Sequence, residues 1–457
     1  MTIAIKSFRL MSKLATGSRR KLVAPLSSMA SPNVSTKPSS ASNVDTPKVV
    51  GVECNDQMKE LKVTWDNGKQ ARYLYVWLRD NCPAPHSTFE SKAAWGRKLL
   101  FKDLDPNVAP TMVQSKPDGV QIVWPENKDS FYESKWLLRR NLDDPEIREK
   151  REDICLENCK QSWTGEKLRS VLRTFDWNEM FSQDRAMLDA LEFLNSWGII
   201  VIDNVPRQTG QAQKLGREFG FLKPSSYGET FQVYSYPDSS NLAYTSFELG
   251  PHTDLPYYID QPEIQGLHCI QSAGPEHGGE NQFVDMCNVA EQIKANCPEH
   301  YKLLTAVPLE YVDDNEDSGV HYRLIGKHSV FSLDSKDRFV CGAWNNQQRS
   351  WFMPGTLEDV RQLYAALFTY RKYYSKPENM FQIRLKSGQF VIFDNLRIMH
   401  GRSAYQVLFL FDLYRVKVTK DTNRHLEGVY YTWDAVRSKI RVLRHKLNLD
   451  SNDHVFA

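Results

Sequence analysis

The chain has 457 residues, of which 58 are Lys or Arg and 56 are Asp or Glu, so its formal charge at pH 7 is +2. With 41% hydrophobic residues, it is long enough for one large domain, a smaller one and a sizeable buried core. The near-neutral balance excludes a nucleic-acid binder that works by bulk charge, and no apolar run reaches the roughly 18 residues that a membrane-spanning helix needs. We therefore expect a globular protein with neither a membrane span nor a nucleic-acid partner.

Residues 1–44 differ in composition from the rest of the chain. They contain seven basic residues, ten serines and no acidic residue. This composition is typical of a mitochondrial transit peptide, although a merely disordered tail is the alternative. The eight cysteines are scattered and do not form a disulfide framework, which favours a reducing compartment. We predict a location in the mitochondrial matrix, with the cytoplasm as the alternative.

Residues 45–140 predict a small β-rich N-terminal domain. An Asp66-Asn67-Gly68 turn separates two alternating segments, 61–65 and 73–78, which is the pattern of a β-hairpin. Residues 141–176 are polar and rich in charge, and they are interpreted as a linker or helical segment.

Residues 177–450 predict the larger domain. Apolar residues recur at helical spacing over 185–197, 210–219, 288–304 and 357–374, and the first of these helices is expected to end at Gly198. Short apolar strands lie between and after them, including 199–202 and 390–393. Helices on a predominantly antiparallel β body indicate an α+β fold rather than a doubly wound sheet.

The segment His252-Thr253-Asp254 carries the strongest chemical signal. On extended backbone His and Asp two residues apart share one face, so an imidazole and a carboxylate can bind one divalent metal. His400, which precedes Gly401 just after an apolar strand, is the best candidate for a third ligand. Two histidines and one carboxylate form the facial triad of non-haem Fe(II) oxygenases. A zinc hydrolase is disfavoured because the chain has no general-base signature such as HExxH.

Four segments that include these residues resemble a known family. Residues 249–258, 266–270, 278–285 and 424–430 together are similar to the γ-butyrobetaine dioxygenase family, whose close relative is trimethyllysine dioxygenase. Both are Fe(II)/2-oxoglutarate oxygenases. The resemblance runs from about Val63 to about Leu447, and it implies a double-stranded β-helix (jelly-roll) catalytic domain behind the small N-terminal domain.

The resemblance implies the cosubstrates. 2-Oxoglutarate chelates the iron through its keto acid, O2 converts it to succinate and CO2, and ascorbate serves as the reductant. The far carboxylate of 2-oxoglutarate needs an arginine, because a bidentate pair fixes its orientation. Arg424 matches the family arginine because His425-Leu426-Glu427-Gly428 follows it. The family's dimers also imply a possible homodimer.

The resemblance further implies a substrate with a quaternary ammonium group. Such a group cannot donate a hydrogen bond, so aromatic faces hold it best. The family's aromatic cage maps onto Tyr227, Phe231, Tyr244 and Tyr430. Two asparagines, Asn241 and Asn345, match family positions near the substrate carboxylate.

Several positions depart from the family pattern. Phe231 stands where the butyrobetaine enzymes carry Trp, and Leu255 replaces a Tyr found in some members. In the N-terminal domain, Ala84 and Ser87 replace cysteines of the family's zinc cluster. The remaining Cys82 and His86 are too few for a closed four-ligand site, so we expect no structural zinc.

The interval between His400 and Arg424 is longer than the family spacing. Removing eleven residues would restore that spacing, so we interpret 407–418 as an insertion. If the insertion is real, its apolar stretch needs a sheet edge or a pocket to cover it, since it is otherwise an aggregation hazard. Arg415, which lies within this stretch, is the second candidate for the 2-oxoglutarate arginine.

The sequence thus predicts a dioxygenase that hydroxylates γ-butyrobetaine to L-carnitine. Trimethyllysine hydroxylation is the alternative within the class, and a catalytically impaired paralogue acting as a binding protein is the alternative outside it. One structural feature separates the active enzyme from the impaired paralogue, namely whether Arg424 lies within reach of the face formed by His252, Asp254 and His400.

Overall fold

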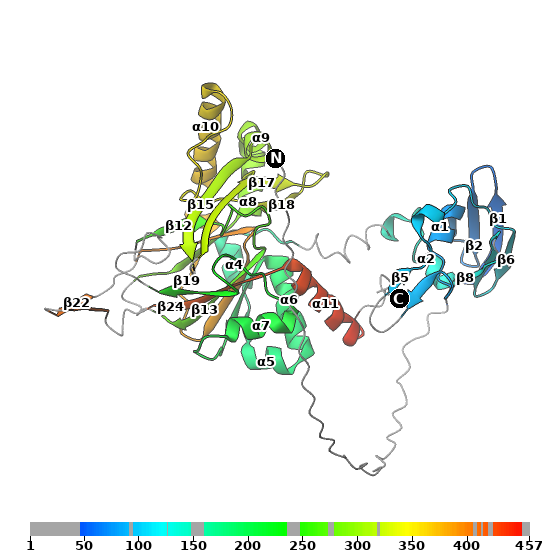
Figure 1. Ribbon diagram of the computed structural model, residues 1–457, viewed down its shortest axis with the longest axis horizontal. Helices are drawn as coiled ribbons and strands as arrows, with labels where there is room; N and C mark the ends of the chain where they lie inside the picture. The colour runs from blue at the N-terminus through cyan, green and yellow to red at the C-terminus, as the bar shows by residue number, and fades with distance from the viewer. Residues whose placement is uncertain are drawn as a thin grey trace, which may run out of the picture. The chain divides into compact units, whose positions relative to one another are not determined.

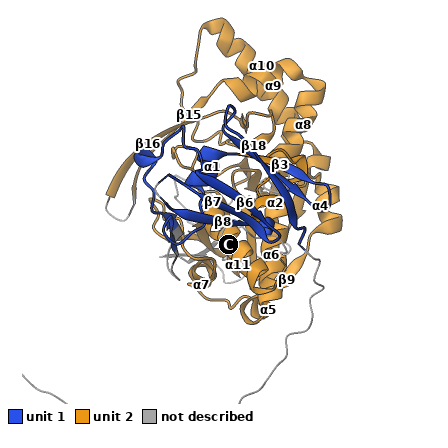
Figure 2. Ribbon diagram, turned by 90° about the vertical axis from the view of Figure 1, so that its right-hand side faces the viewer, with its two compact units in different colours: residues 1–70, 74–135 blue, residues 71–73, 136–457 orange. Residues whose placement is uncertain are grey.

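The computed structural model describes residues 46–90, 95–125, 127–147, 160–234, 247–272, 278–317, 320–404, 409–412, 415–418 and 424–449. The chain forms two compact units (Figure 2), residues 1–70 with 74–135 and residues 71–73 with 136–457.

The N-terminal part of the chain is built mainly from short antiparallel strands in three small sheets. The first sheet contains β1 (Val49–Asn55), β2 (Glu60–Trp65) and β3 (Gln70–Leu74). The others are β4 (Thr88–Glu90) with β5 (Trp95–Arg97), and β6 (Met112–Lys116), β7 (Gly119–Val123) and β8 (Asp129–Glu133). The helices are α1 (Tyr75–Asp80), α2 (Ser134–Leu138) and the short η1 (Phe101–Asp103). The predicted hairpin is present, since β2 and β3 flank the turn that contains Gly68, whose φ is +81°.

Two sheets form the centre of the second unit. The larger has the order β11 (Thr230–Tyr234), β24 (His425–Tyr431), β13 (Ile264–Gln271), β20 (Gln389–Asp394), β10 (Ile199–Asp203) and β9 (Thr174–Asp176). The smaller has the order β12 (Leu249–His252), β21 (Ile398–Arg402), β14 (Asn281–Asp285) and β19 (Met380–Ile383). The predicted mainly antiparallel body is confirmed among the described strands, because in these two sheets β9 and β10 pair in parallel and the other described pairs are antiparallel.

The alternation of apolar residues along the central strands explains how the sheets pack. Ile200 and Ile202 of β10 join one core with the helices, whereas Ile199 and Val201 point to a second core. Phe283 of β14 lies in that second core, so the two sheets face each other across it. Because β10 is buried on both faces, every residue of 199–202 is apolar, without the alternation of a strand that has one exposed face.

Helices cover the two sheets on opposite sides (Figure 1). One group contains α5 (Trp177–Ser182), α6 (Asp184–Trp197), α7 (Gln211–Phe219) and α11 (Trp433–Lys446). The other contains α8 (Met286–Asn296), α9 (Pro298–Ala306) and α10 (Leu357–Tyr374). The remaining elements are α4 (Gly165–Val171), η4 (Pro377–Asn379) and the hairpins β15 (Leu309–Asp317) with β16 (Val320–His328) and β17 (Phe331–Leu333) with β18 (Phe339–Gly342).

The predicted helices agree with the structure except at one point. The helix ending at Gly198 is confirmed, and Gly198 has the left-handed conformation that only glycine adopts readily. The single helix predicted over 288–304 is wrong, because α8 ends at Asn296 and α9 starts at Pro298. Pro298 has no N–H for the helical ladder, so it starts a helix but cannot continue one. Among the described residues, no helix is both long enough and apolar enough to cross a membrane.

The predicted insertion over 407–418 lies partly outside the described residues. Its described strands, β22 (Phe409–Asp412) and β23 (Arg415–Val418), pair with each other as an antiparallel hairpin. The side chain of Arg415 lies outside what the structure describes. The insertion therefore stays a prediction.

Candidate metal centre

His252, Asp254 and His400 come together at the junction of β12 and β21. The two strands are antiparallel, and His252 lies directly opposite His400. Nε2 of His252 is 3.2 Å and Nε2 of His400 is 3.6 Å from Oδ1 of Asp254. Each of the three residues offers one ligand atom, and these three atoms lie within 4.8 Å of one another. Among the described residues, these three side chains form the group that could hold a metal ion. The structure thus brings together the three side chains that the sequence singled out.

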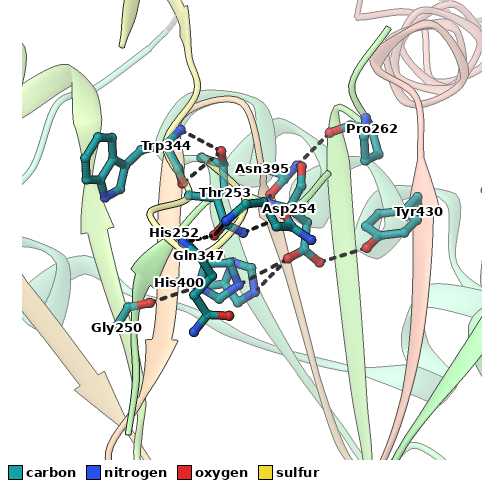
Figure 3. A network of polar contacts seen from close by, with 12 residues as sticks. Gly250, His252, Thr253, Asp254, Pro262, Trp344, Gln347, Asn395, His400 and Tyr430 are labelled. Atoms are coloured by element: carbon teal, nitrogen blue, oxygen red, sulfur yellow. Dashed lines mark hydrogen bonds and ion pairs between the residues drawn. The ribbon is translucent and has the colours of Figure 1, made fainter. Parts of the chain in front are cut away.

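The histidine rings are held in a ligand-ready orientation (Figure 3). Nδ1 of His252 is 2.9 Å from the carbonyl oxygen of Gly250. A carbonyl can only accept, so Nδ1 carries the proton and the lone pair of Nε2 faces Asp254 and His400. The two rings lie 4.2 Å apart, and both histidines are only 8% exposed.

Asn395 fixes the backbone of the carboxylate ligand. Its Oδ1 accepts the N–H of Asp254 at 2.7 Å, and its Nδ2 donates to the carbonyls of Asp254 and Pro262. Figure 3 shows this amide between the two chain segments. On the other side, Thr253 accepts the N–H of Trp344 at 3.0 Å. Sequence reasoning missed Asn395, because its partner lies 141 residues away along the chain and only the fold reveals the contact.

The electrostatics of this group suit a divalent cation. Burial raises the pKa of Asp254, but the neighbouring His400 and His252 and a hydrogen bond from Tyr430 hold it below its ordinary value overall. Burial, helped by His252, lowers the pKa of His400 to about 3. The site therefore offers one carboxylate and two imidazoles, which is a donor set that binds Fe(II) and leaves further positions open.

Arg424 lies near this centre, at the start of β24. It is 9% exposed, and its Nη2 donates to Oδ1 of Asn281 at 3.4 Å. Asn281 pairs with Arg402, and two residues further along β14 Phe283 pairs with His400. Two residues of strand span roughly 7 Å, so Asn281, which the guanidinium contacts, lies about that far along the strand from the row of His400. This separation suits a small dicarboxylate that reaches from the metal to the arginine.

Three of the predicted cage residues meet in the structure. The rings of Tyr227 and Phe231 are 6.1 Å apart, and those of Phe231 and Tyr430 are 5.3 Å apart. Phe231 pairs with Gly428 across the β11–β24 ladder, and a Cβ at Gly428 would come within 2.1 Å of the Phe231 ring. Glycine at that position is therefore what allows the ring to lie flat on the strand.

Tyr430 links the cage to the metal group. Its hydroxyl donates to Oδ2 of Asp254 at 2.8 Å, while the two histidines approach Oδ1 of the same carboxylate (Figure 3). A substrate held by the Tyr430 ring would therefore lie beside the metal.

The asparagines predicted to contact the substrate carboxylate have different outcomes. Asn345 lies with His252 and Trp344 in the wall of a cavity of about 470 Å³. Its Nδ2 donates to Gln348 at 2.9 Å, and its Oδ1 accepts the N–H of Gln347 at 3.0 Å. Asn241 and Tyr244 lie outside the described residues.

Cys82 and His86 occupy the N-terminal position where the sequence predicted a lost zinc site. The sulfur of Cys82 is 3.9 Å from Nε2 of His86 and 2.8 Å from Oγ of Ser130. Trp124 also donates to Oγ of Ser130 at 2.9 Å, so Cys82 belongs to a buried network of uncharged groups.

Two family models match the chain. The model described as "Taurine catabolism dioxygenase TauD, TfdA family" matches residues 161–430, and "Gamma-butyrobetaine hydroxylase-like, N-terminal" matches residues 52–138. Curated relatives include the γ-butyrobetaine dioxygenases of Pongo abelii and Homo sapiens. Each is 31% identical over 395 residues, which are 86% of this chain and 97% of the relative. The trimethyllysine dioxygenase of Meyerozyma guilliermondii is 29% identical over 76% of this chain and 87% of its own length.

Proposed function

The chain belongs to the γ-butyrobetaine dioxygenase family within the TauD-type dioxygenases, and on that premise we propose that it hydroxylates γ-butyrobetaine to L-carnitine. The reaction consumes 2-oxoglutarate and O2 and releases succinate and CO2. The observation that carries the proposal is the position of Tyr430, whose ring belongs to the aromatic group and whose hydroxyl bonds the carboxylate of the metal group.

In this proposal His252, Asp254 and His400 hold Fe(II), and their proximity supports the assignment. Iron bound there, together with 2-oxoglutarate and O2, would supply the oxidising power that places a hydroxyl group on an unactivated carbon. Burial keeps the imidazole of His400 neutral, and the carbonyl of Gly250 fixes the ring of His252. Asn395 holds the Asp254 backbone in place and would keep that carboxylate oriented toward the metal.

Arg424 is proposed to bind the far carboxylate of 2-oxoglutarate. Its burial strengthens such a charge-assisted pair, because few water molecules compete for either group. Asn281, which already accepts from this guanidinium, would hold it in place. Because Asn281 lies on the strand that pairs with the strand of His400, this contact favours an active enzyme over an impaired paralogue.

The substrate is proposed to place its trimethylammonium group against Tyr227, Phe231 and Tyr430. Aromatic faces attract such a cation by about 2 kcal/mol when the contact is desolvated. Asn345, together with Asn241 and Tyr244 by their motif positions, would complete the site around the rest of the substrate. Both γ-butyrobetaine and trimethyllysine carry the cation, so the cage alone does not choose between them. The higher identity and coverage of the γ-butyrobetaine dioxygenases of Pongo abelii and Homo sapiens, compared with the trimethyllysine dioxygenase of Meyerozyma guilliermondii, favour the former.

The finer points of the fold and location complete the proposal. The two facing sheets are proposed to be the halves of a double-stranded β-helix, and the chain is proposed to form a homodimer in solution. Residues 1–44, with seven basic residues and no acidic residue, are proposed to direct it to mitochondria. A fluorescent fusion that loses mitochondrial location when 1–44 are deleted would support this; unchanged location would contradict it.

The test is succinate formation by the purified chain with Fe(II), ascorbate and 2-oxoglutarate, comparing γ-butyrobetaine with trimethyllysine at equal concentrations. The proposal predicts the greater stimulation by γ-butyrobetaine, and abolition of that stimulation in Asp254→Ala. Greater stimulation by trimethyllysine would keep the class of reaction and overturn the substrate. Full activity of Asp254→Ala would overturn the metal assignment.

A further inference from the structure

A tight turn directly after Asp254 leads the chain from the metal group to the aromatic cage. Leu255 has φ +54°, a left-handed conformation that is uncommon for a residue other than glycine. Tyr258 donates its N–H to the carbonyl of Leu255 at 3.1 Å and closes the turn. Such backbone persists only where the surroundings hold it, and Leu255 is 4% exposed within the core beside α10.

The two tyrosines of this turn contact the loop that carries Tyr227. The hydroxyl of Tyr258 accepts the N–H of Ser226 at 2.7 Å, and the hydroxyl of Tyr257 lies 3.4 Å from that of Tyr227. Tyr257 is 1% exposed and belongs to the same packed cluster as Tyr227, Phe231 and Tyr430. The turn therefore adds a further aromatic residue to the three predicted cage residues that lie together in the described part of the chain.

The β15–β16 hairpin also packs against Tyr257. A Cβ added at Gly326 of β16 would come within 2.8 Å of the carbonyl carbon of Tyr257, so the hairpin backbone packs directly against the turn. Asp313 lies on β15 of the same hairpin, and its interaction with Tyr257 opposes the rise in pKa that burial gives this carboxyl group.

Tyr257 thus lies between Tyr227 and an acidic side chain. Its hydroxyl is 3.4 Å from that of Tyr227, and Asp313 adds to the rise in the pKa of Tyr257 that burial and Tyr227 cause. An acidic group close behind an aromatic residue increases the attraction of that site for a cation.

We propose that Tyr257 is a further wall of the cation site and that Asp313 is the positioning residue behind it, so that together they set the preference for a cationic substrate. This inference rests on the proposed function, because it assigns residues to the recognition of the same trimethylammonium group. Tyr257 lies in the segment 249–258 that carries the resemblance but is not among the predicted cage residues, and Asp313 lies outside the four segments of resemblance.

The test compares the binding of γ-butyrobetaine with that of its uncharged-end isostere, 5,5-dimethylhexanoate, in which carbon replaces the quaternary nitrogen. Calorimetry on the full chain loaded with Mn(II) and 2-oxoglutarate measures both affinities without turnover. The variants are Tyr257→Leu, Tyr257→Phe and Asp313→Asn. The matched controls are Tyr311→Phe, a buried tyrosine bonded to Ala343, and Asp314→Asn, an exposed carboxylate beside Asp313.

The wild-type chain is expected to prefer the cation. Tyr257→Leu should reduce that preference about tenfold, whereas Tyr257→Phe and Asp313→Asn should each reduce it about threefold. The controls should leave it unchanged. If Tyr257→Leu does not fold, as judged by circular dichroism, the other two variants carry the test.

Two failures can be told apart. If the wild-type chain prefers the cation and the preference survives in all three variants, the inference is wrong and the proposed function stands. If the wild-type chain shows no preference for the cation, the proposed function and the inference both fail.

Discussion

At the scale of single residues, the metal group depends on side chains that never touch the metal. Asn395 makes three hydrogen bonds around Asp254, one accepted and two donated. Groups that orient metal ligands in this way usually change metal affinity 10–100-fold when they are removed, a range of roughly 1.4–2.8 kcal/mol.

We therefore predict that Asn395→Ala weakens Mn(II) binding by about tenfold or more, measured from the electron paramagnetic resonance signal of free Mn(II). Asn379→Ala is the matched control, because Asn379 is equally buried but bonds Asn288 and Gln292. Equal losses in the two variants would show that the effect is general destabilisation rather than ligand positioning.

Gly428 offers a second test at this scale. Its added methyl group would overlap the ring of Phe231, so Gly428→Ala should displace that wall of the cage and raise the KM for γ-butyrobetaine about tenfold. Gly51→Ala, where nothing lies within 4 Å of the new Cβ, should leave the KM unchanged. If Gly428→Ala has the wild-type KM, Phe231 does not form part of the cage.

The three metal ligands could be predicted from the sequence, whereas the side chains that hold them in place could not. His252 and Asp254 share a face because strand side chains alternate, and His400 follows a recognisable apolar strand, so local rules were enough. Asn395 supports the group through contacts with Asp254, and the role proposed for Tyr257 involves Tyr227; both contacts depend on how distant segments fold back. Local patterns carry no information about such contacts.

At the scale of secondary-structure elements, a buried ion pair holds the strand that carries His400. Arg397 and Asp285 are both fully buried, and Nη2 of Arg397 is 2.8 Å from Oδ2 of Asp285. Arg397 also donates to the carbonyls of Gln161 and Ser196, and Asp285 accepts the N–H groups of Trp163 and Cys287. The pair thus joins the end of β14 and the residue before β21 to three other segments. These are residues 161–163, the C-terminal end of α6 and the N-terminal end of α8.

Removing one partner would leave the other charge buried and unpaired. Arg397→Met should lower the free energy of unfolding by about 3–5 kcal/mol, measured by urea titration with tryptophan fluorescence. The exposed pair of Arg361 and Glu358 on α10 is the control, and Arg361→Met should cost no more than about 0.5 kcal/mol. Similar stabilities for the two variants would contradict the role given to the buried pair.

The same elements explain the one error in predicting helices. Apolar spacing continues from α8 into α9, because both helices pack on the same core, and a pattern-based reading therefore joins them. The break at Pro298 is a backbone property that spacing does not report. The 18 residues of α10 were predicted correctly, since a long amphipathic segment with a capping box at Thr356 has clear limits.

At the scale of the whole molecule, ligand binding and stability are linked. A metal that binds the folded chain through His252, Asp254 and His400 stabilises it by mass action, by about 2.7 kcal/mol at 100 times the dissociation constant. Mn(II) should therefore raise the melting temperature of the second unit by several degrees in the wild-type chain and not in His400→Ala, and EDTA should reverse the rise. An equal rise in His400→Ala would place the stabilising metal elsewhere.

The central claim is that this chain inserts oxygen from O2 into γ-butyrobetaine at the group formed by His252, Asp254 and His400. Mass spectrometry of a reaction under ¹⁸O2 tests it most directly, because both products of a dioxygenase record the origin of their oxygen. The account predicts carnitine with one ¹⁸O in its new hydroxyl group, succinate with one ¹⁸O, and neither labelled product from Asp254→Ala. Labelled succinate without carnitine, or labelled carnitine from Asp254→Ala, would contradict the account.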